Sequence, residues 1–354
     1  QNITATGLNL TTSGNITVDN ISATNSDNVS GTLTIDATGN VTFINNDSTF
    51  NALSVEADNG VALSANLTTD TGAITFDSSS DTLDLNANVT AATSLTVQNF
   101  NLVDLAANVD LTATSGSITV TNNVTSIDLS GAGGTNEITA GTNISLTAIT
   151  DSANVTELGI AAADDITTAD ITLNNLVTSL LDVNADTNNG GGTLSMGNLT
   201  AGQITVDGTG ADDIFTFNGT VTSSNTTVLI NLANNVTLSG DVTAATNLTI
   251  SNVNTAVQLG TNIDLIATAG TVDVNDSVTG IELTGTNGTN LIQASVDVEL
   301  SAITDTSAAG PTELNIQSGQ NMTLSTVTLD GSGNVTLDID FDTGVDGGST
   351  LTAL

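Results

Sequence analysis

Apolar and polar residues alternate in short runs along the whole chain. Examples are TLTID (32–36), ALSVEA (52–57), AITFD (73–77), SLTVQ (94–98) and SITVT (117–121). Alternation with a period of two is the pattern of a β-strand that buries one face. The segments between these runs are rich in Gly, Asn and Asp, which tolerate the positive φ angles of turns. No window of helical length carries an apolar stripe, so the pattern predicts strands and turns with no significant helix.

The strand-like runs recur at a nearly constant spacing. Their first apolar residues lie 20 to 23 residues apart, and a second series keeps the same spacing. The first series is Leu33, Leu53, Ile74, Leu95, Ile118, Ile138 and Leu158, and the second is Val41, Val61, Leu83, Val103, Ile127 and Leu146. Two or three short strands in each repeat are typical of a solenoid, whose coils bury their apolar faces only by stacking. A β-sandwich also has short strands, but nothing in that architecture maintains a constant spacing.

The spacing therefore predicts an all-β fold, a right-handed parallel β-solenoid (β-helix) with about 20–22 residues per coil. Residues 1–354 are expected to form a single continuous solenoid of roughly 17 coils, about 80 Å long at a strand separation of about 4.8 Å. Two neighbouring columns of inward side chains are expected. They are Leu33, Leu53, Ile74 and Leu95 in one column, and Ile35, Val55, Phe76 and Val97 in the other.

One motif occurs five times at longer intervals. Its copies are NITATGLNL (2–10), NVTAATSLTV (88–97), DITTADITL (165–173), DVTAATNLTI (241–250) and NMTLSTVTL (321–329). Copies one, three and five have nine residues and copies two and four have ten, so the units alternate. Residues 105–152 also match residues 259–306 at 23 of 48 positions. The offset of 154 residues equals seven coils of 22, and a whole number of coils would keep every stacked position in register.

The charge of the chain narrows the classes of partner. The sequence has 38 acidic residues and no Lys, Arg, His or Cys, which gives a formal net charge of −38. Such a charge excludes nucleic acid as a partner and favours cations, divalent ions or basic surfaces. No apolar run approaches the about 18 residues of a membrane span, so we expect no membrane insertion. The 38% of hydrophobic residues supports a packed core rather than disorder.

The repeat style resembles that of very large bacterial surface exoproteins. Strands that begin Asn-apolar-Thr, as in residues 88–90, and turns rich in Gly and Asn resemble filamentous-haemagglutinin-type secreted proteins, autotransporter passengers and β-strand-repeat proteins. That resemblance implies a parallel β-helix shaft and an extracellular or cell-surface location. Those proteins usually carry Lys and Arg, which this chain lacks, and the acidic repeats of archaeal surface fibres are an alternative. We expect the structural shaft of an extracellular fibre, filament or giant adhesin.

End-to-end continuation is also expected. The repeat pattern is under way at the first motif copy and persists at NVTLDIDFD (334–342), and no amphipathic capping helix is evident. An uncovered terminal coil has unpaired backbone groups that template further strand addition. The pattern therefore predicts self-association end to end or continuation into further coils.

The segment DGTGADDIF (207–215) is the candidate metal site. It fits the calcium-binding nonapeptide pattern apart from Asp207 at the first position, and Asp207 and Asp212 are the predicted metal ligands. Calcium sites of this kind need tandem neighbours, yet the related segments carry Asn136 and Asn290 where Asp212 stands. An ordinary solenoid turn is the alternative. No cofactor is required by this interpretation, and Ca²⁺ is the ion that such an oxygen-rich turn would bind.

A ligand-binding solenoid module for Ca²⁺, a glycan or an ice surface is the alternative function. Outward Thr-x-Thr pairs such as 32/34, 112/114 and 326/328 would suit an ice surface, although threonine is also an ordinary residue of solvated strands. Of 43 asparagines, 21 begin an Asn-x-Ser/Thr sequon, so N-glycans are predicted as an alternative to asparagines that only stabilise turns. A binding module should interrupt the repeat with a long aromatic or polar loop, and the pattern shows none.

No enzymatic activity is predicted, because the usual reagents are missing. The lyases and hydrolases built on β-helices need Arg, Lys or His in the site, and the chain has none. A glycosidase needs only two carboxylates, which leaves the pairs Asp164/Asp165 and Asp212/Asp213. Adjacent residues on a strand point to opposite faces, so either pair makes a poor catalytic dyad. We therefore assign no catalytic residues.

Overall fold

The computed structural model describes residues 4–79, 81–174, 177–210, 212–286, 288–306, 313–329, 336–341 and 351–353. The chain is an all-β parallel β-solenoid of about 14 turns, so the predicted fold class is confirmed. It divides into two compact units, Gln1–Ala169 and Asp170–Leu354. One helix, α1 (Ala23–Ser26), lies in the described residues and has four residues. No helix in the described ranges has the length and apolar character that a membrane span requires.

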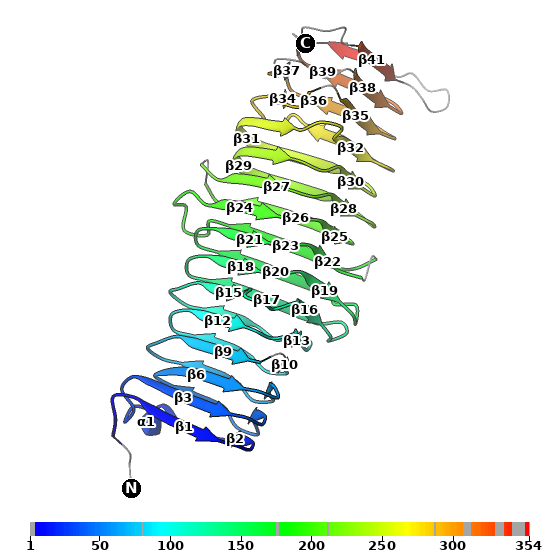
Figure 1. Cartoon of the computed structure of the whole chain (residues 1–354). Coiled ribbons are helices and arrows are strands. Elements are labelled where there is room, and N and C mark those ends of the chain that lie inside the picture. The colour runs from blue at the N-terminus through cyan, green and yellow to red at the C-terminus, as the bar shows by residue number, and fades with distance from the viewer. Residues whose placement is uncertain are drawn as a thin grey trace. The chain divides into compact units, whose positions relative to one another are not determined.

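Each complete coil of the first unit contributes one short strand to each of three faces, and the strands of successive coils pair in parallel (Figure 1). The first face holds β1 (Leu8–Thr12), β3 (Thr32–Ala37), β6 (Ala52–Ala57), β9 (Ile74–Ser78), β12 (Leu95–Gln98), β15 (Ile118–Val120), β18 (Ile144–Leu146) and β21 (Ile166–Thr168). The second face holds β2 (Ile16–Val18), β4 (Val41–Phe43), β7 (Val61–Leu63), β10 (Thr82–Leu85), β13 (Leu102–Leu105), β16 (Ser126–Leu129) and β19 (Ile149–Asp151). The third face holds β5 (Ser48–Phe50), β8 (Leu67–Thr69), β11 (Val89–Ala91), β14 (Leu111–Ala113), β17 (Thr135–Ala140) and β20 (Glu157–Ala162).

Inward side chains stack in columns because the strand period of two repeats in register from coil to coil. Leu53 pairs with Leu33 and Ile74, and Leu95 continues the same column. The neighbouring column of Ile35, Val55, Phe76 and Val97 is likewise in register. All four residues of that second column are at most 1% exposed. The two inward columns predicted from the sequence are therefore confirmed.

The predicted register is wrong beyond residue 118. Ile118 pairs with Ile144, 26 residues later (118 to 144), whereas Ile138 pairs with Leu111 on the third face. The second series fails at the same coil, because Ile127 pairs with Ile149 rather than Leu146. A loop between β16 and β17 lengthens this coil. Longer coils of this kind explain why the solenoid has about 14 turns rather than roughly 17.

Glycine makes the loop between β16 and β17 compatible with close stacking. A Cβ atom added to Gly131 would lie 1.8 Å from the backbone nitrogen of Ala107, and one added to Gly134 would lie 2.6 Å from the Cβ of Ala107. The loop backbone therefore rests directly on the preceding coil. Coil length can change here without separating the stacked strands.

Successive copies of the repeated motif shift by one corner of the coil. In copy two the first strand, β11, stacks on the third face and the second strand, β12, on the first face. The first strand of copy three is β21, and its Ile166 stacks above Ile144 in the column that contains Leu95. Copy three thus begins where copy two ends. The step between these copies is a whole number of coils plus one corner, so the expectation that motif copies stay in register is wrong.

The second unit has the same three-strand coil. One set of paired strands is β22 (Ile171–Thr172), β25 (Leu199–Ala201), β28 (Val221–Ser223), β30 (Val242–Ala244), β32 (Asp264–Ala267), β35 (Thr289–Ala294), β38 (Glu313–Ser318) and β41 (Thr336–Phe341). A second set is β23 (Leu180–Ala185), β26 (Gln203–Gly208), β29 (Val228–Leu238), β31 (Leu248–Leu259), β33 (Val272–Val274), β36 (Val298–Leu300), β39 (Met322–Leu324) and β42 (Leu351–Ala353). The remaining strands are β24 (Thr193–Met196), β27 (Ile214–Phe217), β34 (Ile281–Leu283), β37 (Ile303–Asp305) and β40 (Val327–Thr328).

The motif shift recurs in the second unit. Copy four has β30 as its first strand, and its second strand begins at Leu248 of β31. Leu248 stacks with Val272, which stacks with Val298 and then with Met322, the start of the first strand of copy five. In both units the next motif copy therefore begins in the column where the previous copy ended.

Strands β29 and β31 each run around a corner of the coil. At the bend Leu232 and Asn252 have left-handed φ angles of 57° and 55°. These two residues occupy equivalent places, since Asn231 pairs with Ser251 and Ala233 with Val253 on either side. Asparagine tolerates this conformation, whereas a leucine in it is strained by about 1–2 kcal/mol.

Replacing Leu232 by Asn is expected to stabilise the protein by about 1 kcal/mol. Leu232 is 39% exposed, so the substitution removes little buried apolar surface. The measurement is the urea midpoint of unfolding followed by circular dichroism. An unchanged or lower midpoint would contradict the expectation, and Leu229→Asn, at an outward position of the same strand with regular φ, is the control.

Candidate functional site

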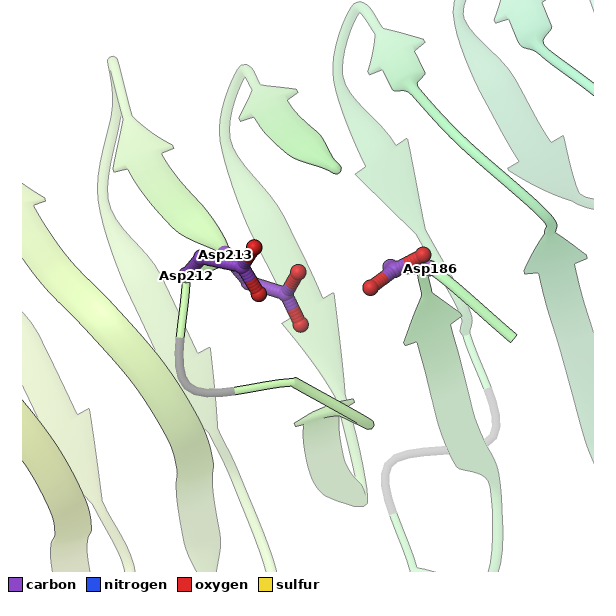
Figure 2. Close-up of side chains that lie close together, drawn as sticks. All are labelled: Asp186, Asp212 and Asp213. Atoms are coloured by element: carbon purple, nitrogen blue, oxygen red, sulfur yellow. The ribbon is translucent and has the colours of Figure 1, made fainter. Parts of the chain in front are cut away.

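Three aspartates from neighbouring coils of the second unit lie together. Asp186 follows β23, whereas Asp212 and Asp213 precede β27. One carboxylate oxygen of each lies within 4.8 Å of one from each of the others. Figure 2 shows the Asp186 side chain facing the Asp212 and Asp213 side chains across the gap between the coils. Asp186 and Asp213 are fully buried, and Asp212 is exposed.

The turn after β23 folds back on the Asp186 carboxylate. The backbone N–H of Gly190 donates to Asp186 Oδ1 at 2.8 Å, and that of Gly191 donates to Asp186 Oδ2 at 3.0 Å. Left-handed φ angles make this tight turn: Asp186 has 61°, Asn189 has 62° and Gly191 has 87°. The Asn- and Gly-rich sequence of residues 186–192 suits such a conformation.

Asp213 is held by both turns. Its carboxylate accepts hydrogen bonds from the N–H of Gly192 at 3.0 Å and of Gly210 at 3.2 Å, and its backbone oxygen accepts one from Asn234 N–H at 2.6 Å. The Asp213 carboxylate therefore ties the turn of its own coil to the turn of the preceding coil.

The buried place of Asp213 corresponds to the asparagines of the related segments. Each lies two positions before a buried strand residue: Asn136 before Ile138, Asn290 before Ile292, and Asp213 before Phe215. Asn136 uses its amide to donate to the backbone oxygens of Ala106 and Val109, at 2.8 and 3.0 Å. The sequence alignment that placed these asparagines opposite Asp212 is thus displaced by one residue.

Asp212 and Asp213 lie in a turn and not on a strand, so the expectation that they point to opposite faces is wrong. Both approach Asp186, and oxygen atoms converge beside Gly210. A Cβ atom added to Gly210 would lie 2.7 Å from Asp212 Oδ1, 2.8 Å from Asn189 Oδ1 and 3.2 Å from Asp186 Oδ2. Carboxylate and amide oxygens are the ligands that Ca²⁺ prefers. The donor set therefore suits a hard cation.

Asp207, the other predicted metal ligand, lies apart from this cluster. It belongs to β26, where inward and outward residues alternate, and its Oδ1 accepts a hydrogen bond from Asn231 Nδ2 at 3.0 Å. Asp207 faces Asp182, whose pKa is raised by burial and by the Asp207 charge. The structure brings Asp212 together with Asp186 and Asp213 instead. Metal binding at either predicted residue stays a prediction.

Several carboxyl groups have raised pKa values because burial disfavours their charged form and a neighbouring carboxylate repels it. The groups are Asp84, Asp182, Asp213, Asp264 and Asp273. For Asp213, burial raises the pKa most; the Gly192 and Gly210 N–H groups oppose the shift, and Asp186 adds to it. Asp19 shows the reverse shift, since hydrogen bonds from Asn45 and Asn46 lower its pKa.

The protein is expected to become more stable as the pH falls from 7 towards 4. A group whose pKa is raised on folding binds more protons in the folded state, so its contribution is complete below the ordinary value of 3.8 and is lost as the pH rises through the folded value. The melting temperature at constant ionic strength measures this dependence. Asp213→Asn should weaken it, and a melting temperature that falls steadily on acidification would contradict it.

Asparagine and aspartate side chains at strand starts form ladders between coils. Asp47 accepts a hydrogen bond from the N–H of Asn66, Asn66 from Asn88, and Asn88 from Asp110, at 3.1, 3.0 and 2.9 Å. The same arrangement occurs at Asn15, Asn143, Asn198 and Asn247. Six of these residues begin sequons, so their amides already stabilise the stack. N-glycosylation of the sequons stays a prediction.

Known proteins supply no closer guide to the site. No protein-family model matches this chain, and no curated protein and no solved structure is significantly similar to it. The parallel β-solenoid of the chain is consistent with a β-helix repeat protein. Any functional conclusion must therefore come from the packing, the charge and the acidic cluster, and the chain is identified as a parallel β-solenoid repeat protein.

Proposed function

We propose that this chain is the structural shaft of an extracellular fibre, filament or giant adhesin. The observation that carries the proposal is the uninterrupted stacking of inward columns. In the first unit Leu95, Ile118, Ile144 and Ile166 succeed one another in register, and each is at most 1% exposed. A coil that is buried only by its neighbours contributes rigidity rather than a separate binding surface.

The chemistry of the side chains supports a mechanical role. The chain has no Lys, Arg, His or Cys, so it lacks the usual bases, nucleophiles and anion-binding groups of enzymes. The proposal accordingly assigns it no reaction. With 38 acidic residues and no basic side chain, the surface repels nucleic acid and other acidic partners and attracts cations or basic surfaces.

An extracellular or cell-surface location is part of this proposal, and so is end-to-end association. Absence of Lys and Arg supports it physically, because trypsin-like proteases that cut after those residues have no site in the sequence. The experiment is immunogold labelling of intact source cells with an antibody against the chain, followed by electron microscopy of the purified particle. Labelled straight fibres are expected. Label confined to the cell interior, or a compact particle, would overturn the proposal.

A second candidate function is cation binding, with Ca²⁺ as the ion. The observation that favours it is the approach of two buried carboxylates, Asp186 and Asp213, in a chain without basic side chains. Two like charges in a buried site repel each other strongly unless a proton or a cation lies between them. In this role the ion would brace the turns of two successive coils. Glycan and ice-surface binding remain predictions from the sequence.

A further inference from the structure

A cavity of about 580 Å³ lies at the beginning of the first unit, against β1, β2 and α1. Its lining is mostly apolar, and it includes Leu8, Leu10, Ile16, Val18, Ile35 and Phe50. Leu10 pairs with Ile35 and so heads an inward column, yet Leu10 is 40% exposed whereas Ile35 is 1% exposed. The cavity is therefore the uncovered inward side of a coil.

Free strand edges border this cavity. Among the described residues β1 pairs with β3 alone in its column, and β2 pairs with β4 alone. Every other inward column is closed by a strand of the next coil. An apolar surface flanked by two parallel strand edges fits another β-strand with inward apolar residues, because main-chain bonds and apolar burial then form together.

Such a strand is present in the second unit. In β41 Leu337 pairs with Leu314 and Ile339 with Ile316, so β41 continues the inward columns of β38. Leu314 and Ile316 are 0% exposed, but Leu337 is 40% exposed. Phe341, at the end of β41, is 38% exposed. Within the described ranges β41 pairs with β38 alone.

We propose that β41 of one copy docks on β2 of a second copy, with Leu337 and Phe341 entering the apolar cavity. The occupant is a second copy because this chain carries both halves of the contact: an apolar cavity with free strand edges, and an exposed apolar strand. The contact has the same geometry as that between successive coils, so it continues an interface that each unit already contains. This inference rests on the proposed function and names the surfaces through which copies of the shaft join.

The two surfaces differ, so the contact is heterologous. A subunit that uses its cavity for one neighbour still presents β41 to another, and the contact propagates instead of closing into a symmetric dimer. Acidic residues flank both sides: Asp19 lines the cavity, and Asp338 and Asp340 lie at outward positions of β41. Salt should therefore favour assembly, since it screens their repulsion.

The experiment compares self-association of the full chain with that of two blocked variants by analytical ultracentrifugation. Leu10→Asp places a charge in the cavity, and Phe341→Asp places one on the docking strand. Each is expected to raise the concentration for half-maximal assembly about tenfold to hundredfold, because an apolar anchor is lost. Thr11→Asp and Thr336→Asp, at outward positions of the same strands, are the controls and should assemble as the unaltered chain does. Circular dichroism establishes that all four variants fold.

Mixing the two blocked variants gives the decisive result. One intact cavity and one intact β41 remain in the mixture, so a 1:1 dimer is expected with no larger species. A mixture that stays monomeric overturns the docking, and so does assembly of either blocked variant at the concentration of the unaltered chain. If the unaltered chain is monomeric at all concentrations and salts but labels surface fibres, the docking fails while the shaft function stands.

Discussion

Replacing Phe76 by alanine is expected to lower the free energy of unfolding by about 3–5 kcal/mol. Phe76 is 0% exposed and lies between Val55 and Val97 in an inward column. Stacked coils leave the neighbouring side chains fixed by their own strand pairings, so they cannot collapse into the space that the ring vacates. The midpoint of urea unfolding, followed by circular dichroism, measures the loss.

Thr75→Ala is the matched control for Phe76→Ala. Thr75 is the adjacent residue of β9 and lies at an outward position, between Ser54 and Thr96 of the neighbouring strands. Its replacement should change the unfolding free energy by less than about 0.5 kcal/mol. If the two substitutions had equal effects, the inward assignment of the Phe76 column would be wrong.

Millimolar Ca²⁺ is expected to raise the melting temperature more than Mg²⁺ does at equal ionic strength. Both ions screen the 38 acidic residues, but only the flexible coordination of Ca²⁺ suits carboxylates fixed by two separate turns. At a concentration one hundred times the dissociation constant, an ion that binds only the folded state adds about 2.7 kcal/mol. Scanning calorimetry in matched CaCl₂ and MgCl₂ solutions measures the difference.

Asp212→Asn is expected to abolish the difference between the two ions, because it removes the exposed carboxylate without disturbing the buried hydrogen bonds of Asp213. Asp207→Asn is the control, since Asp207 lies on β26 outside the cluster, and this variant should keep the calcium response. Equal responses to Ca²⁺ and Mg²⁺ in the unaltered chain would leave only a diffuse ion atmosphere.

The fold could be predicted because a solenoid repeats one local pattern. Between Leu33 and Ile118 the coils differ by at most three residues in length, and there the predicted columns match the structure. The prediction failed where the loop at Gly131 lengthens a coil. A fixed spacing then assigns Ile138 to the first face, although its strand lies on the third. Inward and outward positions are still correct there, because the period of two is local.

The candidate metal site could be predicted only in part, because its members come from different coils. Asp212 was found through its local Gly-Asp pattern. Asp186 lies 26 residues earlier (186 to 212) in a segment that matches no calcium motif, and only coil stacking brings it close. The signal that could have found it is an Asn- and Gly-rich turn at residues 186–192, about one coil before the second acidic turn.

The one-corner shift of the motif copies has an evolutionary consequence. In the first unit the segment that begins at Val89 on one face begins again at Ile166 on the next, and the strands stack equally well at both corners. The three corners of a coil are thus interchangeable hosts for the same few residues. A tandem gene duplication in such a protein need not span a whole number of coils to give a foldable product. Any breakpoint at a corner serves, so unequal recombination can lengthen the chain in steps of a third of a coil.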